Sequence, residues 1–178
     1  MNTSADMPVY MTQVGYQQLL YKLAEKQREY DQVRDHRQVA FELSGDGWHD
    51  NPEFNRMQQM EANLNHTMKM LTDRLDMMKI IEINDAMRNC DQVEIGSIVH
   101  LRRYDLAEDS VQDEFWEIRG FDETNIPQQH LAYNAPLASK IMYLQVGDIA
   151  EEVRIGSRHF DIEVVQLFPS RISAKLVS

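Results

Sequence analysis

Cysteine is almost absent from this sequence, and long apolar runs are absent altogether. The one cysteine, Cys90, excludes an intrachain disulfide framework, and no cysteine and histidine cluster has the spacing of a zinc site. No segment approaches the roughly 20 apolar residues that a bilayer crossing needs. The N-terminal Met1–Tyr10 lacks the basic and apolar regions of a secretory signal. These absences predict a cytoplasmic protein without a membrane partner.

Basic charge is also scarce. The chain has 18 lysines and arginines against 29 aspartates and glutamates, for a net charge of -11. Residues 1–90 contribute 14 acids and 10 bases, and residues 91–178 contribute 15 acids and 8 bases, so both halves are acidic. A dense basic stripe, which sequence-independent binding to duplex DNA requires, is missing from both. We therefore expect no independent binding to duplex DNA.

The familiar catalytic motifs are missing from the second half of the chain. It contains no nucleophile elbow, no glycine-rich phosphate loop and no HExxH pair. His100, His130 and His159 are scattered over strand-like segments, where surface or structural roles are the usual ones. Cys90 is interpreted as a small buried apolar residue and not as a reactive thiol.

Two long apolar stripes with helical spacing occupy residues 1–90. From Thr12 to Leu43 there is no proline, and no glycine after Gly15. The first stripe comprises Leu19, Leu23, Tyr30, Val33 and Ala40, and the second comprises Phe54, Met57, Met60, Leu64, Met68, Leu71, Leu75 and Met78. Steps of three and four residues predict two helices that pack antiparallel as a coiled-coil hairpin, about 45 Å long at 1.5 Å per residue.

The turn between the two helices, Ser44 to Phe54, is unusually acidic. Gly45 and Gly47 can adopt positive φ angles and end the first helix. Asn51 is a good N-cap for the second helix, followed by Pro52 and Glu53 at favourable first-turn positions. The turn needs neither Asp46 nor Asp50 for folding. Those two carboxylates are either solvated loop acids or a functional site.

Residues 91–178 have the pattern of a small antiparallel α+β domain. Five segments have strand-like composition or alternation: Ser97–Tyr104, Glu114–Gly120, His130–Tyr133, Ile149–Ile155 and Arg158–Phe168. Gly156 and Ser157 predict a hairpin turn between the last two. A short helix, Asn134–Met142, is predicted with Asn134 as its cap. The fold class is therefore α+β, with a helical hairpin first and the sheet domain second.

Two local patterns resemble the bacterial Gre transcript-cleavage factors, over residues from about 11 to 168. In the turn, Gly45-Asp46 followed by Asp50 to Phe54 is similar to the family's Gly-Asp, then acid-Asn-x-Glu-aromatic. In the second half, Asn134 to Ala138, then Ile141 and Gly147-Asp148, is similar to the family's Ser-Pro-[Ile/Leu]-[Ala/Gly] helix and the segment after it. The order and separation of the two patterns make the resemblance fairly specific.

The resemblance implies a fold, a partner and an activity. The second domain is expected to be FKBP-like and to dock on RNA polymerase without prolyl isomerisation. The hairpin is expected to enter the secondary channel of the polymerase and to stimulate hydrolysis of backtracked RNA near its 3′ end. The protein would then be an accessory factor that activates the nuclease activity of the polymerase, and not an enzyme by itself.

The implied site residues lie at or near the turn. Asp46 and Asp50 are the expected catalytic residues and ligands of a Mg²⁺ ion shared with the polymerase, with Glu53 as a lesser contributor. Trp48, Arg37 and Arg56 are the expected contacts to RNA. Trp48 has two interpretations, since it either stacks on a nucleotide base or folds back over the hairpin end.

The turn also departs from the family pattern. Asp46 and Asp50 are four steps apart, where the family has three, and Asp50 replaces the usual glutamate. Glu42 stands where the family commonly has an arginine. These departures keep open a second function, a regulator or inhibitor that occupies the channel without promoting cleavage. A third interpretation is a coiled-coil adaptor with a peptide-binding or prolyl-isomerase-like domain.

Overall fold

The computed structural model describes residues 9–84, 88–105 and 107–175, and the segment before residue 9, predicted not to be a secretory signal, lies outside them. The chain forms two compact units. Tyr16–Met78 belongs to the first, and Val9–Gly15 joins the residues from Lys79 onward in the second. In chain order the elements are β1 (Val9–Thr12), α1 (Gln13–Ser44), η1 (Gly45–Asp50), α2 (Pro52–Asp76), β2 (Met78–Ile81), β3 (Ile98–Asp105), β4 (Ser110–Arg119), η2 (Ile126–Gln128), β5 (His130–Ala132), α3 (Pro136–Ile141), β6 (Ile149–Ile155), β7 (Arg158–Phe168) and α4 (Arg171–Lys175).

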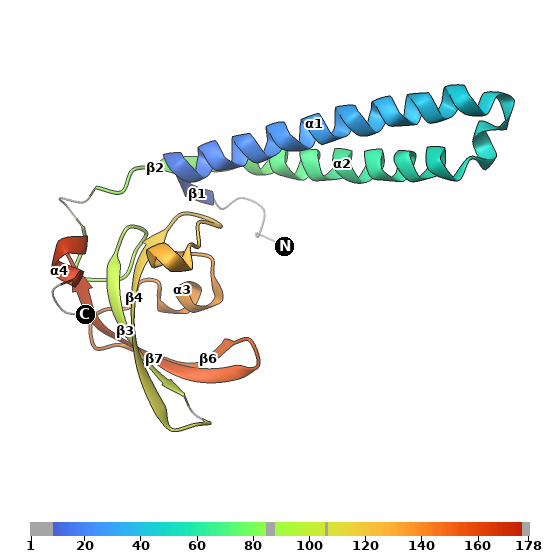
Figure 1. Ribbon diagram of the computed structural model, residues 1–178. Coiled ribbons are helices and arrows are strands. Elements are labelled where there is room, and N and C mark those ends of the chain that lie inside the picture. The colour runs from blue at the N-terminus through green and yellow to red at the C-terminus, as the bar shows by residue number, and fades with distance from the viewer. Residues whose placement is uncertain (1–8, 85–87, 106, 176–178) are drawn as a thin grey trace, which may run out of the picture. The chain divides into compact units, whose positions relative to one another are not determined.

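The first unit is the predicted helical hairpin, with α1 and α2 antiparallel and the short 3₁₀ helix η1 at their junction (Figure 1). The buried apolar residues follow the predicted stripes at Leu19, Val33, Ala40, Phe54, Met57 and Leu71. Two members of the second stripe do not fit. Met60 is 40% exposed, and Met78 lies in β2, because α2 ends at Asp76. Two helices alone cannot enclose a seam, so much of it stays half-buried.

A polar contact also joins the two helices. The Tyr30 hydroxyl donates to Glu61 Oε1 at 2.9 Å, and Arg37 Nε lies 2.9 Å from Glu61 Oε2. One carboxylate on α2 thus receives a hydrogen bond and an ion pair from two positions on α1. Among the described residues, no helix combines the length and the apolar character needed to span a membrane.

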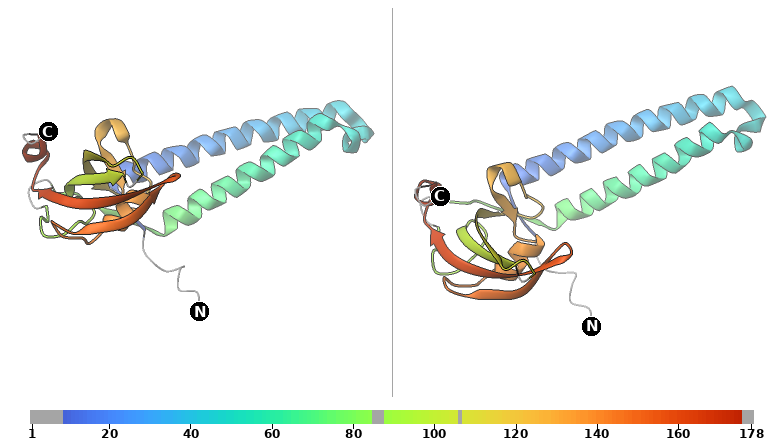
Figure 2. Two further views of the ribbon diagram at one scale, coloured as in Figure 1. Left: turned by 90° about the horizontal axis from the view of Figure 1, so that it is seen from below. Right: turned by 60° about the horizontal axis from the view of Figure 1, so that its bottom comes forward.

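The second unit is built on a five-stranded sheet with the order β5-β4-β3-β7-β6. All neighbours are antiparallel except β4 and β5, which are parallel, so the predicted antiparallel sheet has one parallel edge. β6 and β7 form a long, curved hairpin (Figure 2). The core lies between the sheet and α3, which contributes Leu137, Ala138 and Ile141. The predicted α+β fold is confirmed.

Two details differ from the predictions. Asn134 does not cap α3; Ala135 occupies the N-cap position, and the Asn134 side chain instead exchanges two 3.0 Å hydrogen bonds with Asp122. The division between the units falls after Met78 and not near residue 90, and the N-terminal strand β1 joins the second unit. The reason is that β1 and β2 pair as a small sheet of their own. Neither four-residue strand was predicted.

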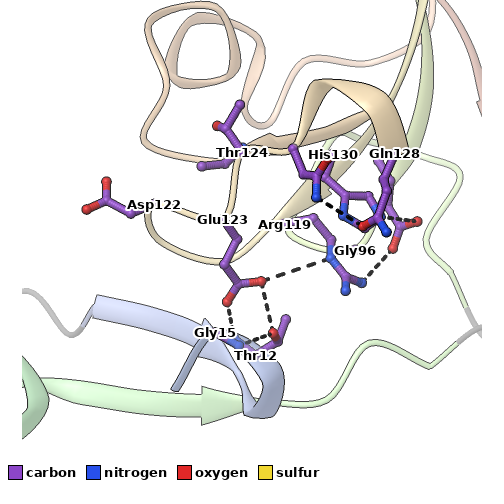
Figure 3. A network of polar contacts seen from close by, with 12 residues as sticks. Thr12, Gly15, Gly96, Arg119, Asp122, Glu123, Thr124, Gln128 and His130 are labelled. Atoms are coloured by element: carbon purple, nitrogen blue, oxygen red, sulfur yellow. Dashed lines mark hydrogen bonds and ion pairs between the residues drawn. The ribbon is translucent and has the colours of Figure 1, made fainter. Parts of the chain in front are cut away.

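The start of α1 is capped by a residue from the distant β4–β5 connection (Figure 3). Thr12 is the N-cap, and its hydroxyl oxygen accepts a hydrogen bond from the Gly15 N–H at 3.2 Å. Glu123 accepts from the Thr12 N–H at 2.7 Å and from the Thr12 hydroxyl at 2.9 Å. In a capping box, a glutamate three residues into the helix makes the return contact to the N-cap N–H. Here Glu123, which is 111 positions from Thr12 in the sequence, makes this contact to the N-cap N–H instead.

Gly15 leaves the space that Glu123 fills. A Cβ atom at Gly15 would lie 2.2 Å from Glu123 Oε1, and one at Gly120 would lie 2.5 Å from the same oxygen. Side chains at these two positions would therefore displace the carboxylate. The cap depends on both glycines as well as on Glu123.

Removing the cap should destabilise the second unit. We expect Glu123→Ala to lower its free energy of unfolding by about 1–2 kcal/mol, because the Thr12 N–H and hydroxyl lose their acceptor. Chemical denaturation monitored by circular dichroism measures the change. Glu82→Ala, which removes an exposed carboxylate, is the control and should change stability by less than about 0.5 kcal/mol. Equal stability of the two variants would contradict the capping role.

A buried carboxylate, Glu117 on β4, organises a second polar cluster in the same unit. Glu117 is 4% exposed. Its carboxylate lies 2.8 Å from Arg119 Nη1 and 3.5 Å from Arg88 Nη2, and it accepts a hydrogen bond from Arg171. Burial acts to raise the pKa of Glu117. The hydrogen bond from Arg171 and the charges of the three arginines outweigh it, so the pKa lies below its usual value.

This lowered pKa predicts an acid-sensitive contribution to stability. The contribution is fully present above the unfolded-state pKa of about 4.3 and is lost as the pH falls through the lower folded-state pKa. We expect Glu117→Gln to cost about 3 kcal/mol at pH 7, since three arginines lose their counter-charge, and to cost less as the pH falls below about 4. Urea denaturation across this pH range measures both. Glu151→Gln, an exposed carboxylate, is the control; a cost for Glu117→Gln that is independent of pH would contradict the assignment.

Candidate functional site

One side chain closes the junction between the two long helices. Asn51 Oδ1 accepts from the backbone N–H groups of Glu53 at 2.8 Å and Phe54 at 3.3 Å, which caps the start of α2 as predicted. Asn51 Nδ2 donates to the Ala40 carbonyl at 3.3 Å and to the Ser44 hydroxyl. Ser44 in turn donates to the Ala40 carbonyl at 2.6 Å. The amide therefore satisfies backbone groups at the end of α1 and at the start of α2.

An aromatic cluster packs against the same junction. The Trp48 ring lies 4.9 Å from the Phe54 ring, edge to face, and 5.7 Å from the Phe41 ring. The His49 ring lies 3.4 Å from the Trp48 ring. Trp48 is half-buried, and Phe54 is buried. Of the two interpretations of Trp48, the structure has the ring folded back over the hairpin end.

Asp46 and Asp50 lie in η1, at the end of the hairpin, and both are exposed. Neither carboxylate forms a hydrogen bond or an ion pair with any residue that the structure describes. A 3₁₀ helix has three residues per turn, so positions four apart differ by about 120° around the axis and by about 8 Å along it. Asp46 therefore shares its side of η1 with His49 and not with Asp50.

The other predicted site residues already have partners in the hairpin. Glu53 forms an ion pair with Arg56 at 2.9 Å, between side chains that are 53% and 63% exposed. The hydrogen bond from Arg56 lowers the pKa of Glu53. Arg37 pairs with Glu61 and lies 5.9 Å from the centre of the Phe54 ring. Glu53, Arg56 and Arg37 would have to leave these contacts to bind a metal ion or RNA.

The carboxylates provide hard oxygen ligands, which Mg²⁺ prefers, but they do not make a complete site. Among the described residues, no group of three histidine, cysteine, aspartate or glutamate side chains is placed to hold a metal ion. Asp46 and Asp50 are free to donate one or two ligands to an ion that is held mainly by another molecule. The donor set thus fits a Mg²⁺ ion whose other ligands come from another molecule.

Two supporting residues were not predicted. Ser44 extends the Asn51 contact to α1, and Phe41 gives Trp48 a packing partner. The signal for Phe41 is an aromatic residue seven positions before Trp48 at the end of a helix with an otherwise polar face. No local pattern marks Ser44, because its role depends on where the Asn51 amide points.

No family model matches the chain. The transcription elongation factor GreA of Maricaulis maris (strain MCS10) is 26% identical over 102 residues, which cover 57% of this chain and 61% of that protein. The chain thus matches about three fifths of the length of this curated relative. The fold and the acidic turn define an α+β protein with a polar-tipped helical hairpin, and the predicted resemblance to the Gre transcription elongation factors is confirmed.

Solved structures give more distant matches. GreA factor homolog 1 (Gfh1) of Thermus thermophilus is 19% identical, with 91% of this chain and 99% of that chain covered and a TM-score of 0.40. GreA/GreB from Nitrosomonas europaea is 16% identical, with 64% and 91% covered and a TM-score of 0.34. These scores are too low to bear on the function of the chain.

Loss of the Asn51 side chain should loosen the acidic turn. We expect Asn51→Ala to lower the free energy of unfolding of the hairpin by about 1–2 kcal/mol, because the caps of both helices are removed. Amide hydrogen exchange at Glu53 and Phe54 should become faster. Asn65→Ala, an exposed change in the interior of α2, is the control and should not destabilise the hairpin. Unchanged exchange at Glu53 and Phe54 would show that Asn51 does not hold the turn.

Proposed function

We propose that the chain is a transcription elongation factor of the Gre type, which binds RNA polymerase and places the η1 turn in its secondary channel. There it stimulates hydrolysis of backtracked RNA by the polymerase. The observation that carries the proposal is the pair of exposed carboxylates, Asp46 and Asp50, which have no partner among the described residues and lie at the end of a long hairpin. The similarity to GreA of Maricaulis maris supports the same assignment.

The length and rigidity of the hairpin suit this role. The 32 residues of α1 span about 48 Å at 1.5 Å per residue. The Asn51 contacts and the Trp48 cluster hold the turn in one conformation, so little ordering entropy is lost when it binds. Held in this way, Asp46 and Asp50 reach a distant centre without a flexible loop.

The chemistry assigned to the turn is accessory. A second Mg²⁺ ion in a phosphoryl-transfer centre activates the attacking water and stabilises charge on the transferring phosphate. Asp46 and Asp50 would each offer carboxylate oxygens to that ion, and the polymerase would supply the remaining ligands and the RNA. Glu53 contributes only after release from Arg56, and Arg37 and Arg56 contact RNA only after leaving Glu61 and Glu53.

A second candidate function is a regulator that occupies the channel without stimulating cleavage. The specific observation in its favour is the 3₁₀ conformation of η1, because positions four apart in a regular 3₁₀ helix, such as those of Asp46 and Asp50, differ by about 120° around the axis. The half-buried Trp48 is a further point, since it packs against Phe41 and Phe54 instead of presenting its ring to a base. Unless η1 changes conformation, only one of the two carboxylates reaches a given ion.

The two candidates predict different results in an RNA cleavage assay with stalled, backtracked polymerase complexes. If the chain stimulates cleavage, we expect Asp46→Ala combined with Asp50→Ala to reduce the stimulated rate at least about tenfold, because the shared ion loses its ligands. Asp73→Ala, which removes an exposed aspartate near the end of α2, is the control and should keep the full rate. Binding to polymerase should be the same for all three proteins.

Each other outcome is informative. Full stimulation by the double variant would contradict the role of Asp46 and Asp50. Binding without stimulation by the wild-type chain would favour the channel-occupying regulator. An absence of polymerase binding would overturn both candidates and favour the coiled-coil adaptor.

A further inference from the structure

Tyr143, just after α3, has a backbone conformation that tyrosine rarely adopts. Its φ angle is 67°, in the left-handed region where a Cβ atom crowds the backbone. It follows Met142, with φ -54° and ψ 134°, and the Leu144 N–H donates to the Ile141 carbonyl at 3.1 Å. These values are those of a type II turn, whose third position is normally glycine or asparagine. A tyrosine there is strained.

The strain is not offset by packing within the second unit. The Tyr143 side chain is 69% exposed, and no hydrogen bond of its hydroxyl is found among the described residues. An exposed aromatic side chain at a strained position therefore lowers the stability of the isolated chain. Strained residues that bring no internal benefit are typical of functional surfaces.

The segment that carries Tyr143 is held firmly by backbone hydrogen bonds. The Tyr143 N–H donates to the Val93 carbonyl at 2.8 Å, and the Val93 N–H donates to the Leu144 carbonyl at 2.9 Å. In the next turn, the Gly147 N–H donates to the Val164 carbonyl at 2.8 Å. Backbone hydrogen bonds thus hold two consecutive turns against neighbouring parts of the unit. The backbone positions from which their side chains extend are therefore fixed.

The second turn adds two more exposed apolar side chains. Val146 is 51% exposed, and Ile149, at the start of the edge strand β6, is 52% exposed. We call these three exposed residues of one short segment, Tyr143, Val146 and Ile149, the turn patch. Aromatic side chains on rigid backbone are the usual anchors of protein interfaces, because little conformational entropy is lost when they bind.

The charges near the turn patch indicate what kind of surface covers it. Residues 140–152 contain three acids, Asp148, Glu151 and Glu152, and one base, Lys140, and all four are exposed. Asp91, which is also exposed, precedes Gln92, whose backbone bridges to Gln145 in the same segment. Acidic surroundings repel the phosphates of nucleic acids and attract basic protein surfaces.

We infer that the turn patch is a docking surface for a protein segment in which an apolar side chain is flanked by basic residues, with Tyr143 as the anchor. This inference rests on the proposed function, since it places that segment on RNA polymerase. The strain at Tyr143 is then a cost to the free chain that binding offsets.

Stability and affinity should change in opposite directions when Tyr143 is replaced. We expect Tyr143→Gly to raise the Tm of the second unit by about 4–8 °C, because glycine adopts the positive φ angle freely. The same change should weaken binding to purified core RNA polymerase about tenfold or more, because the aromatic anchor is lost. Tyr143→Asn, which keeps a Cβ atom and tolerates this conformation, should weaken binding equally and excludes added backbone flexibility as the cause.

Gln129 provides a matched control. It has a φ angle of 56°, is exposed and lies at the end of η2. Gln129→Gly should raise the Tm in a similar way and leave polymerase affinity unchanged. If basic residues of the polymerase face the turn patch, Glu151→Lys should weaken polymerase binding. The affinity of the wild-type chain should also fall as the salt concentration rises.

The results separate this inference from the proposed function. If the wild-type chain binds polymerase and both Tyr143 variants bind equally well, the turn patch is not the docking surface and the proposed function stands. If the wild-type chain does not bind polymerase, both fail. Self-association of the free chain that Tyr143→Gly abolishes, measured by analytical ultracentrifugation, would assign the patch to a second copy of the chain and overturn the inference.

Discussion

The acidic turn depends on one amide side chain that serves two helices. Every helix end leaves backbone groups without partners, and a tight connection between two long helices brings two such ends together. Asn51 donates to a carbonyl of α1 and accepts from two N–H groups of α2. Because Asn51 satisfies the backbone groups at this connection, the connection does not need the Asp46 and Asp50 side chains for its structure. The same requirement at the other end of α1 is met by Glu123, from a distant part of the chain.

The function of the turn depends on how rigid that arrangement is. The aromatic cluster and the Asn51 contacts hold η1 in a 3₁₀ conformation with the two aspartates on different sides. In the proposed function, a rigid turn of this kind would present one carboxylate to the shared Mg²⁺ ion, and a turn that rewinds on binding would present two. In the proposed function, cleavage stimulation and channel occupancy would thus differ only by a local conformational change in η1.

Local patterns were enough to predict much of the fold. The helical hairpin follows from the spacing of apolar residues, and the Asn51 cap follows from its place before Pro52. The main strands follow from alternation, as in β7. Residues whose roles depend on partners elsewhere in the chain could not be predicted. Glu123 caps α1 although it is 111 positions away from Thr12. The position of the Trp48 ring depends on its packing against both Phe41 and Phe54. Asn134 had an equally good alternative partner in Asp122, which local signals do not reveal.

The contact between Glu61 and both Tyr30 and Arg37 has a consequence for the register of the hairpin. A seam rich in methionine tolerates sliding, because methionine fills gaps of many shapes. Two directional contacts to one carboxylate do not tolerate it. A slip of one helical turn would move α2 by about 5.4 Å along α1, which is more than twice the length of a magnesium–oxygen bond. Glu61, seven positions after the acidic turn, thereby fixes the position of α2 along α1.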